Sequence, residues 1–132
     1  MIMNIPSDLK YAKTDEWVRV EGNTATIGVT DFAQSQLSDV VFVEINVNPG
    51  DTCSRGKVFG TIESVKAASD VNLPVSGKVL VIHNELADTP EKINSEPYTT
   101  AWMVQLELSN PAELNDLMDA AAYQQFCETR GH

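Results

Sequence analysis

Alternating apolar and polar positions dominate the first half of the chain and predict strands. Residues 17–21 and 24–29 carry β-branched side chains at alternate positions on either side of Gly22-Asn23. This pair tolerates the positive φ angles of a tight turn, so the two runs predict a β-hairpin. The run 40–45 is more uniformly apolar and predicts a more buried strand, which a turn at Pro49-Gly50 follows.

Four further short runs, 57–64, 68–73, 77–83 and 102–108, also have strand character. Turn signals recur roughly every 8–12 residues, which is typical of an all-β sandwich or barrel. Trp17 and Trp102 both lie in such runs. We therefore expect both indole rings to be mostly buried and to pack the strands against the sandwich core.

Two segments have helical signals. Thr30 is a capping residue before an acidic first turn, and helical spacing follows as far as Leu37. Asn110 and Pro111 begin a second helical segment, with Glu113 at a capping-box position, and Asp119 is placed to cap a separate piece ending near Cys127. We expect one domain over residues 1–132, with a sandwich at about 10–108 and a C-terminal helical segment at about 111–128.

Charge restricts the classes of partner. The chain has 9 basic and 19 acidic residues, a formal net charge of −10. Nucleic acid and anionic membranes repel such a surface, whereas basic patches on enzymes would attract it, although the charge could also serve solubility alone. No stretch approaches the ~20 apolar residues of a membrane span, and the N-terminus lacks the basic and apolar regions of a signal peptide. We expect a cytoplasmic location.

Groups that perform catalysis or bind metals are sparse. Cys53 and Cys127 lie far apart without metal or redox spacing, and His83 and His132 have no neighbouring ligands in the sequence. Buried thiols and surface imidazoles are the simpler interpretation. The sequence shows neither a nucleophile–base pairing nor a phosphate-binding loop, so we expect a chain with no catalytic residues and no metal site.

The segment 60–70 contains the most informative chemistry. Strand-like residues flank a reversal at which Lys66 is followed by Ala67 and Ala68. A carrier needs an amine that projects from a rigid support, beside a backbone slim enough for an enzyme to approach. Acylation would turn this ammonium into a neutral amide on a long flexible stem. A solvated lysine in a turn is the alternative interpretation of the same pattern.

The run from Glu63 to Asp70 resembles the lipoyl attachment motif of glycine cleavage system H proteins. The similarity extends from about Leu9 to Phe126 in the order of that family. It includes the segments 10–12, 16–18, 28–34, 41–44, 74–79, 93–94 and 97–98 together with Leu37 and Trp102.

Several residues depart from the family pattern. Asp15 stands where the family commonly has His, Ile45-Asn46 replaces Leu-Pro, and Lys92 replaces an apolar residue. Ala101 stands where Gly is typical, which bears on the backbone conformation of residues 98–102 because Ala accepts positive φ poorly.

The resemblance implies a flattened sandwich of the barrel-sandwich hybrid or lipoyl-domain type, with lipoate attached to Lys66. Glu63, Ser64, Val65, Ala67 and Ala68 would form the recognition hairpin. The implied partners are glycine decarboxylase (P protein), aminomethyltransferase (T protein), dihydrolipoamide dehydrogenase (L protein) and lipoate-attaching enzymes. The chain would shuttle the aminomethyl group of glycine from the P protein to the T protein, and the reduced dithiol to the L protein. Chemistry would then belong to the partners' cofactors and transport to this chain.

The resemblance also implies that the loaded arm folds back into a surface cleft. Glu16 and Asp70 match the positions whose carboxylates would face its ammonium group, and a charge-assisted pair with exclusion of water would protect it. The alternative is that both are ordinary solvated acids near a hairpin.

Two other carrier functions compete with glycine cleavage. Biotin carriers share the exposed-hairpin design, but their lysine typically has Met on both sides, whereas Val65 and Ala67 flank Lys66. A lipoyl relay protein, which passes its lipoyl group on to 2-oxoacid dehydrogenase subunits, would carry the same motif.

Overall fold

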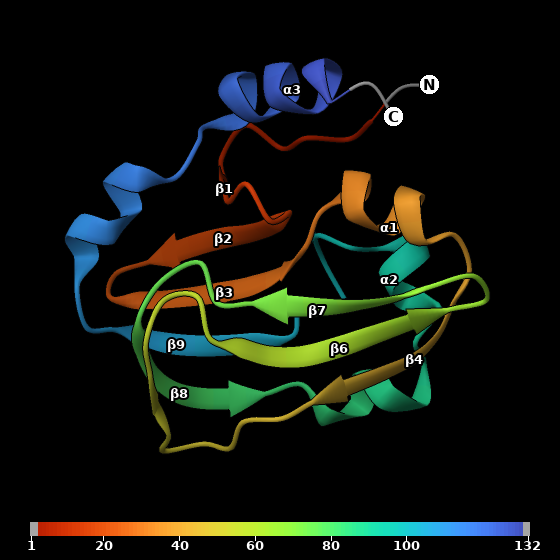
Figure 1. Cartoon of the computed structure of the whole chain (residues 1–132). Helices are drawn as coiled ribbons and strands as arrows, with labels where there is room; N and C mark the ends of the chain where they lie inside the picture. Colours follow the sequence, from red (N-terminus) through yellow and green to blue (C-terminus); the bar gives the residue numbers. More distant parts are fainter. Residues whose placement is uncertain (1–2, 131–132) are drawn as a thin grey trace.

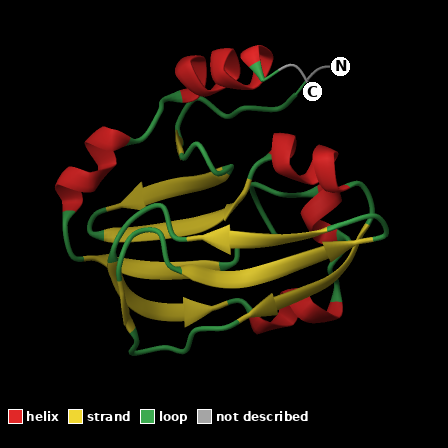
Figure 2. Ribbon diagram, viewed as in Figure 1, coloured by secondary structure: helices red, strands yellow, loops and turns green. Residues whose placement is uncertain are grey.

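Two antiparallel sheets pack face to face in the computed structural model, which describes residues 3–130 (Figure 1). One sheet has six strands in the order β1-β2-β3-β9-β8-β5, and the other has three in the order β4-β6-β7. Helical elements are short and lie around the sandwich (Figure 2). The predicted two-sheet β fold is confirmed. His132 lies outside the described residues.

The strands agree closely with the runs predicted from the sequence. Their bounds are β1 Lys10–Tyr11, β2 Glu16–Glu21, β3 Thr24–Val29, β4 Val40–Ile45, β5 Thr52–Cys53, β6 Val58–Ser64, β7 Ala68–Asn72, β8 Gly77–Ile82 and β9 Val104–Leu108. The two-residue strands β1 and β5 were not predicted, because so short a run has no measurable alternation. Gly22 has a φ of 62°, which confirms the tight turn between β2 and β3.

The helical elements are α1 Asp31–Leu37, η1 Asn84–Asp88, α2 Lys92–Ser95, η2 Pro111–Asp116 and α3 Ala120–Thr129. The Thr30 hydroxyl caps α1 by accepting from the backbone N–H of Ala33 at 3.2 Å, and Asp119 caps α3 through Ala122 at 2.8 Å. No helix within residues 3–130 is long and apolar enough to span a membrane.

The expected capping box at Asn110 is not formed. Asn110 makes no side-chain cap bond, and Glu113 instead accepts hydrogen bonds from the backbone N–H and the hydroxyl of Ser76, at 2.7 and 2.9 Å. Glu113 thus bonds to Ser76, which is distant in the sequence, instead of to the nearby Asn110. The segment is a 3-10 helix, and these bonds connect it to the start of β8.

Two clusters of buried side chains stabilise the fold. The larger fills the space between the sheets, and the smaller joins β1, β2, α1 and α3 on the outside of the six-stranded sheet. Successive side chains of a strand point to opposite faces, so Val18 enters the first cluster and Trp17 the second. The expectation that Trp17 packs into the sandwich core is therefore wrong, although its burial is complete.

Trp102 differs from the prediction in a second way. It precedes β9 instead of lying in it, and it is only partly buried. Its ring stacks on His83, with ring centroids 4.4 Å apart. Ala101 is buried and does not have a positive φ. The family's glycine is thus replaced without backbone strain at this position.

Strand β4 is less buried than predicted. It is an edge strand of the three-stranded sheet, and a register shift between Val40 and Phe42 inserts one extra residue relative to β6. Val41 and Phe42 consequently both face outward, with 55% and 44% of their surfaces exposed.

Candidate functional site

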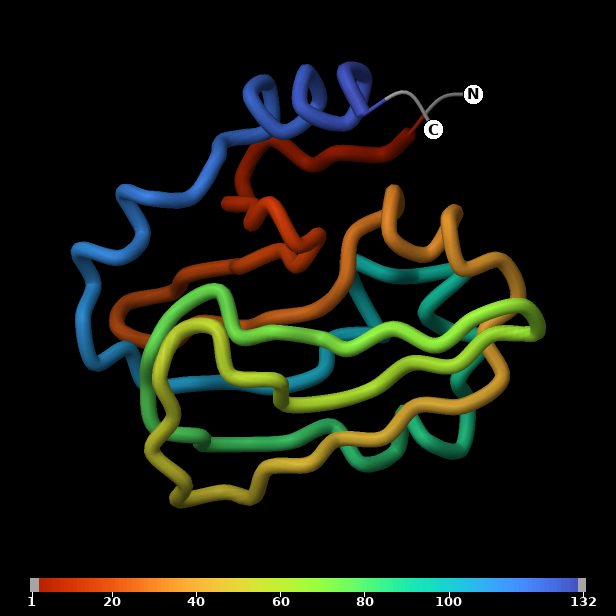
Figure 3. The backbone as a smooth tube through the Cα atoms, viewed as in Figure 1, coloured from red at the N-terminus to blue at the C-terminus, as the bar shows by residue number. Residues whose placement is uncertain are grey.

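Lys66 lies in the turn of the hairpin formed by β6 and β7. This hairpin turns at the right-hand edge of the backbone trace (Figure 3). The Ser64 N–H donates to the Ala67 carbonyl at 2.7 Å and closes the turn. The Ser64 hydroxyl oxygen also accepts from the backbone N–H groups of Lys66 and Ala67, at 3.2 and 3.1 Å. The turn is therefore held by its own polar groups while the lysine side chain is exposed.

The other residues of the predicted recognition hairpin surround this lysine. Glu63 and Ala68 are exposed and face each other across the two strands. Val65 is 68% exposed, and its N–H donates to the Asp39 carbonyl at 3.0 Å. This bond ties the tip to the start of β4, so the lysine projects from a braced support.

A cavity of about 250 Å³ adjoins the hairpin, and we call it the hairpin cleft. It lies between the turn before β2, helix α1 and the edge of β7. Its lining combines carboxylates with apolar side chains: Thr14, Asp15, Glu16, Val29, Ala33, Gln36, Leu37, Ile62, Ala67, Ser69, Asp70 and Val71. Ala67, the neighbour of Lys66, is part of this wall, so the cleft begins beside this lysine.

Glu16 lies inside the hairpin cleft and is only 1% exposed. It shares a strand face with Val18, so the alternation of β2 turns its carboxylate toward the interior. The Thr14 hydroxyl donates to one carboxylate oxygen, and the Asn72 N–H donates to the other at 3.1 Å. The alternative of a solvated surface acid is wrong for Glu16.

Burial raises the pKa of Glu16 to about 7, although the Thr14 hydroxyl and the Asn72 N–H favour the ionised form. The folded protein therefore binds this proton more tightly than the unfolded chain does. The cost of burying the charge is absent below about pH 4.5 and complete above about pH 7.

We expect the difference in unfolding free energy between wild type and Glu16→Gln to change by about 3 kcal/mol across that pH window. Wild type should lose stability relative to the variant as the pH rises. Urea titrations of both proteins at several pH values measure the difference. A difference that stays constant with pH would contradict the raised pKa.

Asp70 also lines the hairpin cleft. It lies on the edge strand β7 and is exposed, in contrast to Glu16. The structure thus brings together the two acids that the resemblance singled out, one buried and one facing solvent. An amine in the cleft would therefore be close to one exposed and one buried acid.

Asp15 is a third acid of the cleft, and its partners were not foreseen. The Arg130 guanidinium donates to both of its carboxylate oxygens, with contacts of 2.6 and 2.8 Å from Nη2, and the Tyr123 hydroxyl donates at 2.8 Å. Burial raises the pKa of Asp15, while Tyr123 and Arg130 oppose this rise. Asp15 is separated from both partners by more than 100 residues in the sequence, so no local sequence pattern predicts these contacts.

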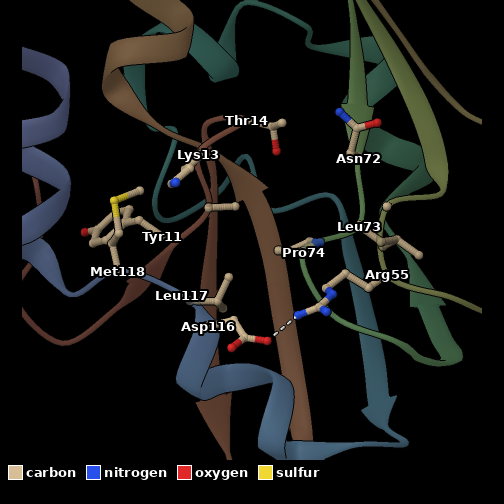
Figure 4. A pocket seen from close by; sticks show the side chains of 12 residues that line it. Tyr11, Lys13, Thr14, Arg55, Asn72, Leu73, Pro74, Asp116, Leu117 and Met118 are labelled. Atoms are coloured by element: carbon tan, nitrogen blue, oxygen red, sulfur yellow. Dashed lines mark hydrogen bonds and ion pairs between the residues drawn. The ribbon is translucent and has the colours of Figure 1, made fainter. Parts of the chain in front are cut away.

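A second cavity, of about 390 Å³, lies on the other side of Thr14 (Figure 4). Tyr11, Leu117 and Met118 form one wall, and Arg55, which donates to Asp116 at 2.8 Å, stands across from them. Neither Lys66, Glu16, Asp70 nor the recognition residues predicted around Lys66 line this cavity. It does not reach Lys66, although Thr14 borders both cavities and Asn72 at the end of β7 forms part of its wall.

Comparison with known proteins gives a consistent result. The family model described as glycine cleavage H-protein matches residues 9–130. A glycine cleavage system H protein of Symbiobacterium thermophilum is 53% identical over 93% of this chain and 95% of its own. Its counterpart in Koribacter versatilis is 52% identical over 98% of this chain and 100% of its own.

A solved structure agrees with these relatives. The crystal structure of a glycine cleavage system H protein from Mycobacterium marinum superposes with a TM-score of 0.82 at 28% identity. The match covers 97% of this chain and 100% of that one.

Proposed function

The chain belongs to the glycine cleavage H-protein family, and we propose that it serves the glycine cleavage system as a lipoyl carrier with Lys66 as the attachment residue. The observation that supports Lys66 is its place at the braced tip of the β6–β7 hairpin, with an exposed amine and a small neighbour, Ala67. When bound, the lipoyl group supplies the dithiol that carries the aminomethyl group of glycine.

The hairpin cleft fits such a group. Its apolar wall, which includes Val29 and Leu37, suits an alkyl chain, and its carboxylates suit an ammonium at the end of that chain. The cleft starts at Ala67, next to the attachment residue. The lining therefore has an apolar part and an anionic part, which suit the alkyl chain and the terminal amine of one loaded lipoyl arm.

We propose that Glu16 and Asp70 hold the amine of the loaded arm and that the cleft walls exclude water from it. Glu16 is the stronger partner, because a buried carboxylate with two fixed donors needs little reorganisation to accept a cation. Asp70 is exposed, so water screens its contribution more.

The cleft favours glycine cleavage over the lipoyl-relay function. A relay protein needs an accessible lysine but no site for an amine, whereas this chain buries a carboxylate beside its carrier hairpin. The family match likewise favours a lipoyl group over biotin. We propose the P, T and L proteins and a lipoate-attaching enzyme as partners of this chain. The role we propose for the chain itself is position and transport.

Removing a cleft carboxylate should release the loaded arm. A charge-assisted hydrogen bond in a partly buried site is worth ~1.5–3 kcal/mol, so Glu16→Gln should raise the rate of ammonia loss about tenfold or more. Asp70→Asn should have a smaller effect because its charge is exposed. The lipoylated protein is loaded with labelled glycine and P protein, P protein is removed, and ammonia is timed without T protein.

Glu85→Gln is the matched control, because it makes the same chemical change at an exposed residue of η1 outside the cleft. It should lose ammonia at the wild-type rate. Equal rates in wild type, Glu16→Gln and Asp70→Asn would contradict the proposed role of the two acids. The attachment at Lys66 would be unaffected by that result.

A further inference from the structure

Three exposed apolar side chains gather beside the proposed carrier lysine. Val65 at the hairpin tip is 68% exposed, and Val41 and Phe42 of the neighbouring strand β4 are 55% and 44% exposed. We call these three residues the β4–tip patch. Single exposed apolar residues are common on protein surfaces, whereas a group at one place marks a contact surface.

The backbone makes the patch one rigid unit. The Val65 N–H donates to the Asp39 carbonyl at 3.0 Å, and Val40 and Phe42 pair with Ser64 and Glu63. The extra residue of the bulge at Val41 turns two adjacent apolar side chains outward, where regular alternation would bury one of them. The patch therefore moves with the lysine and keeps a fixed position relative to it.

Acidic residues border the patch. Asp39, Glu44 and Glu63 are exposed, and none of them takes part in an ion pair with the residues the structure describes. These three acids are part of the excess of acidic residues that gives the chain its net charge of −10. An apolar centre with a charged rim is the arrangement of a protein interface, and it fits a partner with an apolar groove and basic margins.

We infer that the β4–tip patch is the docking surface for the enzyme that attaches the lipoyl group to Lys66. This inference rests on the proposed attachment at Lys66. In the attachment step the reacting atom is the lysine Nζ, so the enzyme's active site must lie within one side-chain length of the turn and must cover the surface around it. Enzymes that use the finished arm meet its sulfur atoms, which the whole lipoyl chain separates from the patch.

The step itself is an acyl transfer. The neutral amine of Lys66 attacks the carbonyl carbon of an activated lipoyl ester or anhydride held by the enzyme. A C–N bond forms, the bond from that carbon to its leaving group breaks, and the leaving group departs with the electron pair. The nitrogen loses one proton to a base, and no oxidant or reductant is needed. The patch contributes by holding the lysine in place.

The test compares two double variants of matched chemistry. Val41→Ser/Phe42→Ser removes the β4 part of the patch, and Leu80→Ser/Val81→Ser removes two exposed apolar residues at a bulge of β8 in the other sheet. Lipoyl transfer onto the full-length unmodified chain by a lipoate-attaching enzyme is followed by intact mass. Thermal unfolding of each variant checks that the fold is retained.

We expect the patch variant to raise KM for the chain tenfold or more with kcat little changed, because truncating central interface residues typically has that effect. The β8 variant should behave like wild type. Asp39→Asn/Glu63→Gln should weaken the dependence of kcat/KM on salt, since screened rim charges act mainly on the association rate.

Equal KM values for the patch and β8 variants would overturn the inference. So would unchanged lipoylation with slower transfer from glycine decarboxylase, which would assign the patch to a later partner. A wild-type dimer that the patch variant converts to monomer would assign it to a second copy of the chain. Peptide mapping of the wild-type product comes first: lipoate elsewhere than on Lys66 would refute the proposed function, whereas the other outcomes concern the patch alone.

Discussion

Replacing Lys66 with arginine is expected to abolish lipoylation of the chain completely. The arginine keeps the positive charge and approximate length, but it has no primary amine to acylate. The turn should be unchanged, because its hydrogen bonds come from Ser64 and the backbone and not from the lysine side chain. The fold of the variant should therefore be intact while the modification is absent.

Intact mass and peptide mapping after incubation with a lipoate-attaching enzyme measure this effect. Lys78→Arg is the matched control, since Lys78 is also exposed but lies within β8, paired with Thr52 and Glu107. It should be lipoylated like wild type. Lipoate found on Lys57 or Lys78 of the wild-type protein would show that the attachment residue is assigned wrongly.

Truncating Trp17 to alanine is expected to destabilise the fold by ~3–5 kcal/mol, the usual cost for a fully buried Trp. The indole N–H donates to the Pro97 carbonyl at 2.9 Å, and the ring lies against Gly28 on the next strand. A Cβ added at Gly28 would stand 2.8 Å from this ring, so the glycine makes room for it. The variant loses both the packing and the hydrogen bond to a loop far away in the sequence.

Trp102→Ala is the comparison, because the same truncation is made at a half-buried ring stacked on His83. Its loss of stability should be clearly smaller than that of Trp17→Ala. Chemical denaturation of the two variants and wild type measures both effects. Similar losses in the two variants, or none in either, would show that the outer cluster contributes less than its burial indicates.

Much of the fold follows from local sequence. The turn at Gly22 and the alternation on either side of it specify the β2–β3 hairpin, because φ preference and side-chain period act within a few residues. Thr30 and Asp119 each cap a helix as their positions indicate, since a cap bond joins residues only three apart. The same local logic places Lys66 in the turn between β6 and β7.

Other features depend on which strands become neighbours. Burial of β4 was predicted from its apolar composition, but its place at a sheet edge and the bulge at Val41 expose it. Trp17 was assigned to the wrong cluster because alternation separates two faces without showing what covers each of them. The C-terminal helix α3 covers the face of β2 that carries Trp17. Tyr123 of α3 stacks on Tyr11 with ring centroids 4.7 Å apart.

By itself, the sequence determined the turn that holds Lys66 and the strands that support it, because these depend on contacts between residues close together in the chain. Only the tertiary structure decided the chemistry of the hairpin cleft. It buries Glu16, leaves Asp70 exposed and pairs Asp15 with Arg130. Desolvation and charge pairing depend on distances between segments far apart in the chain, and no local pattern of residues encodes those distances.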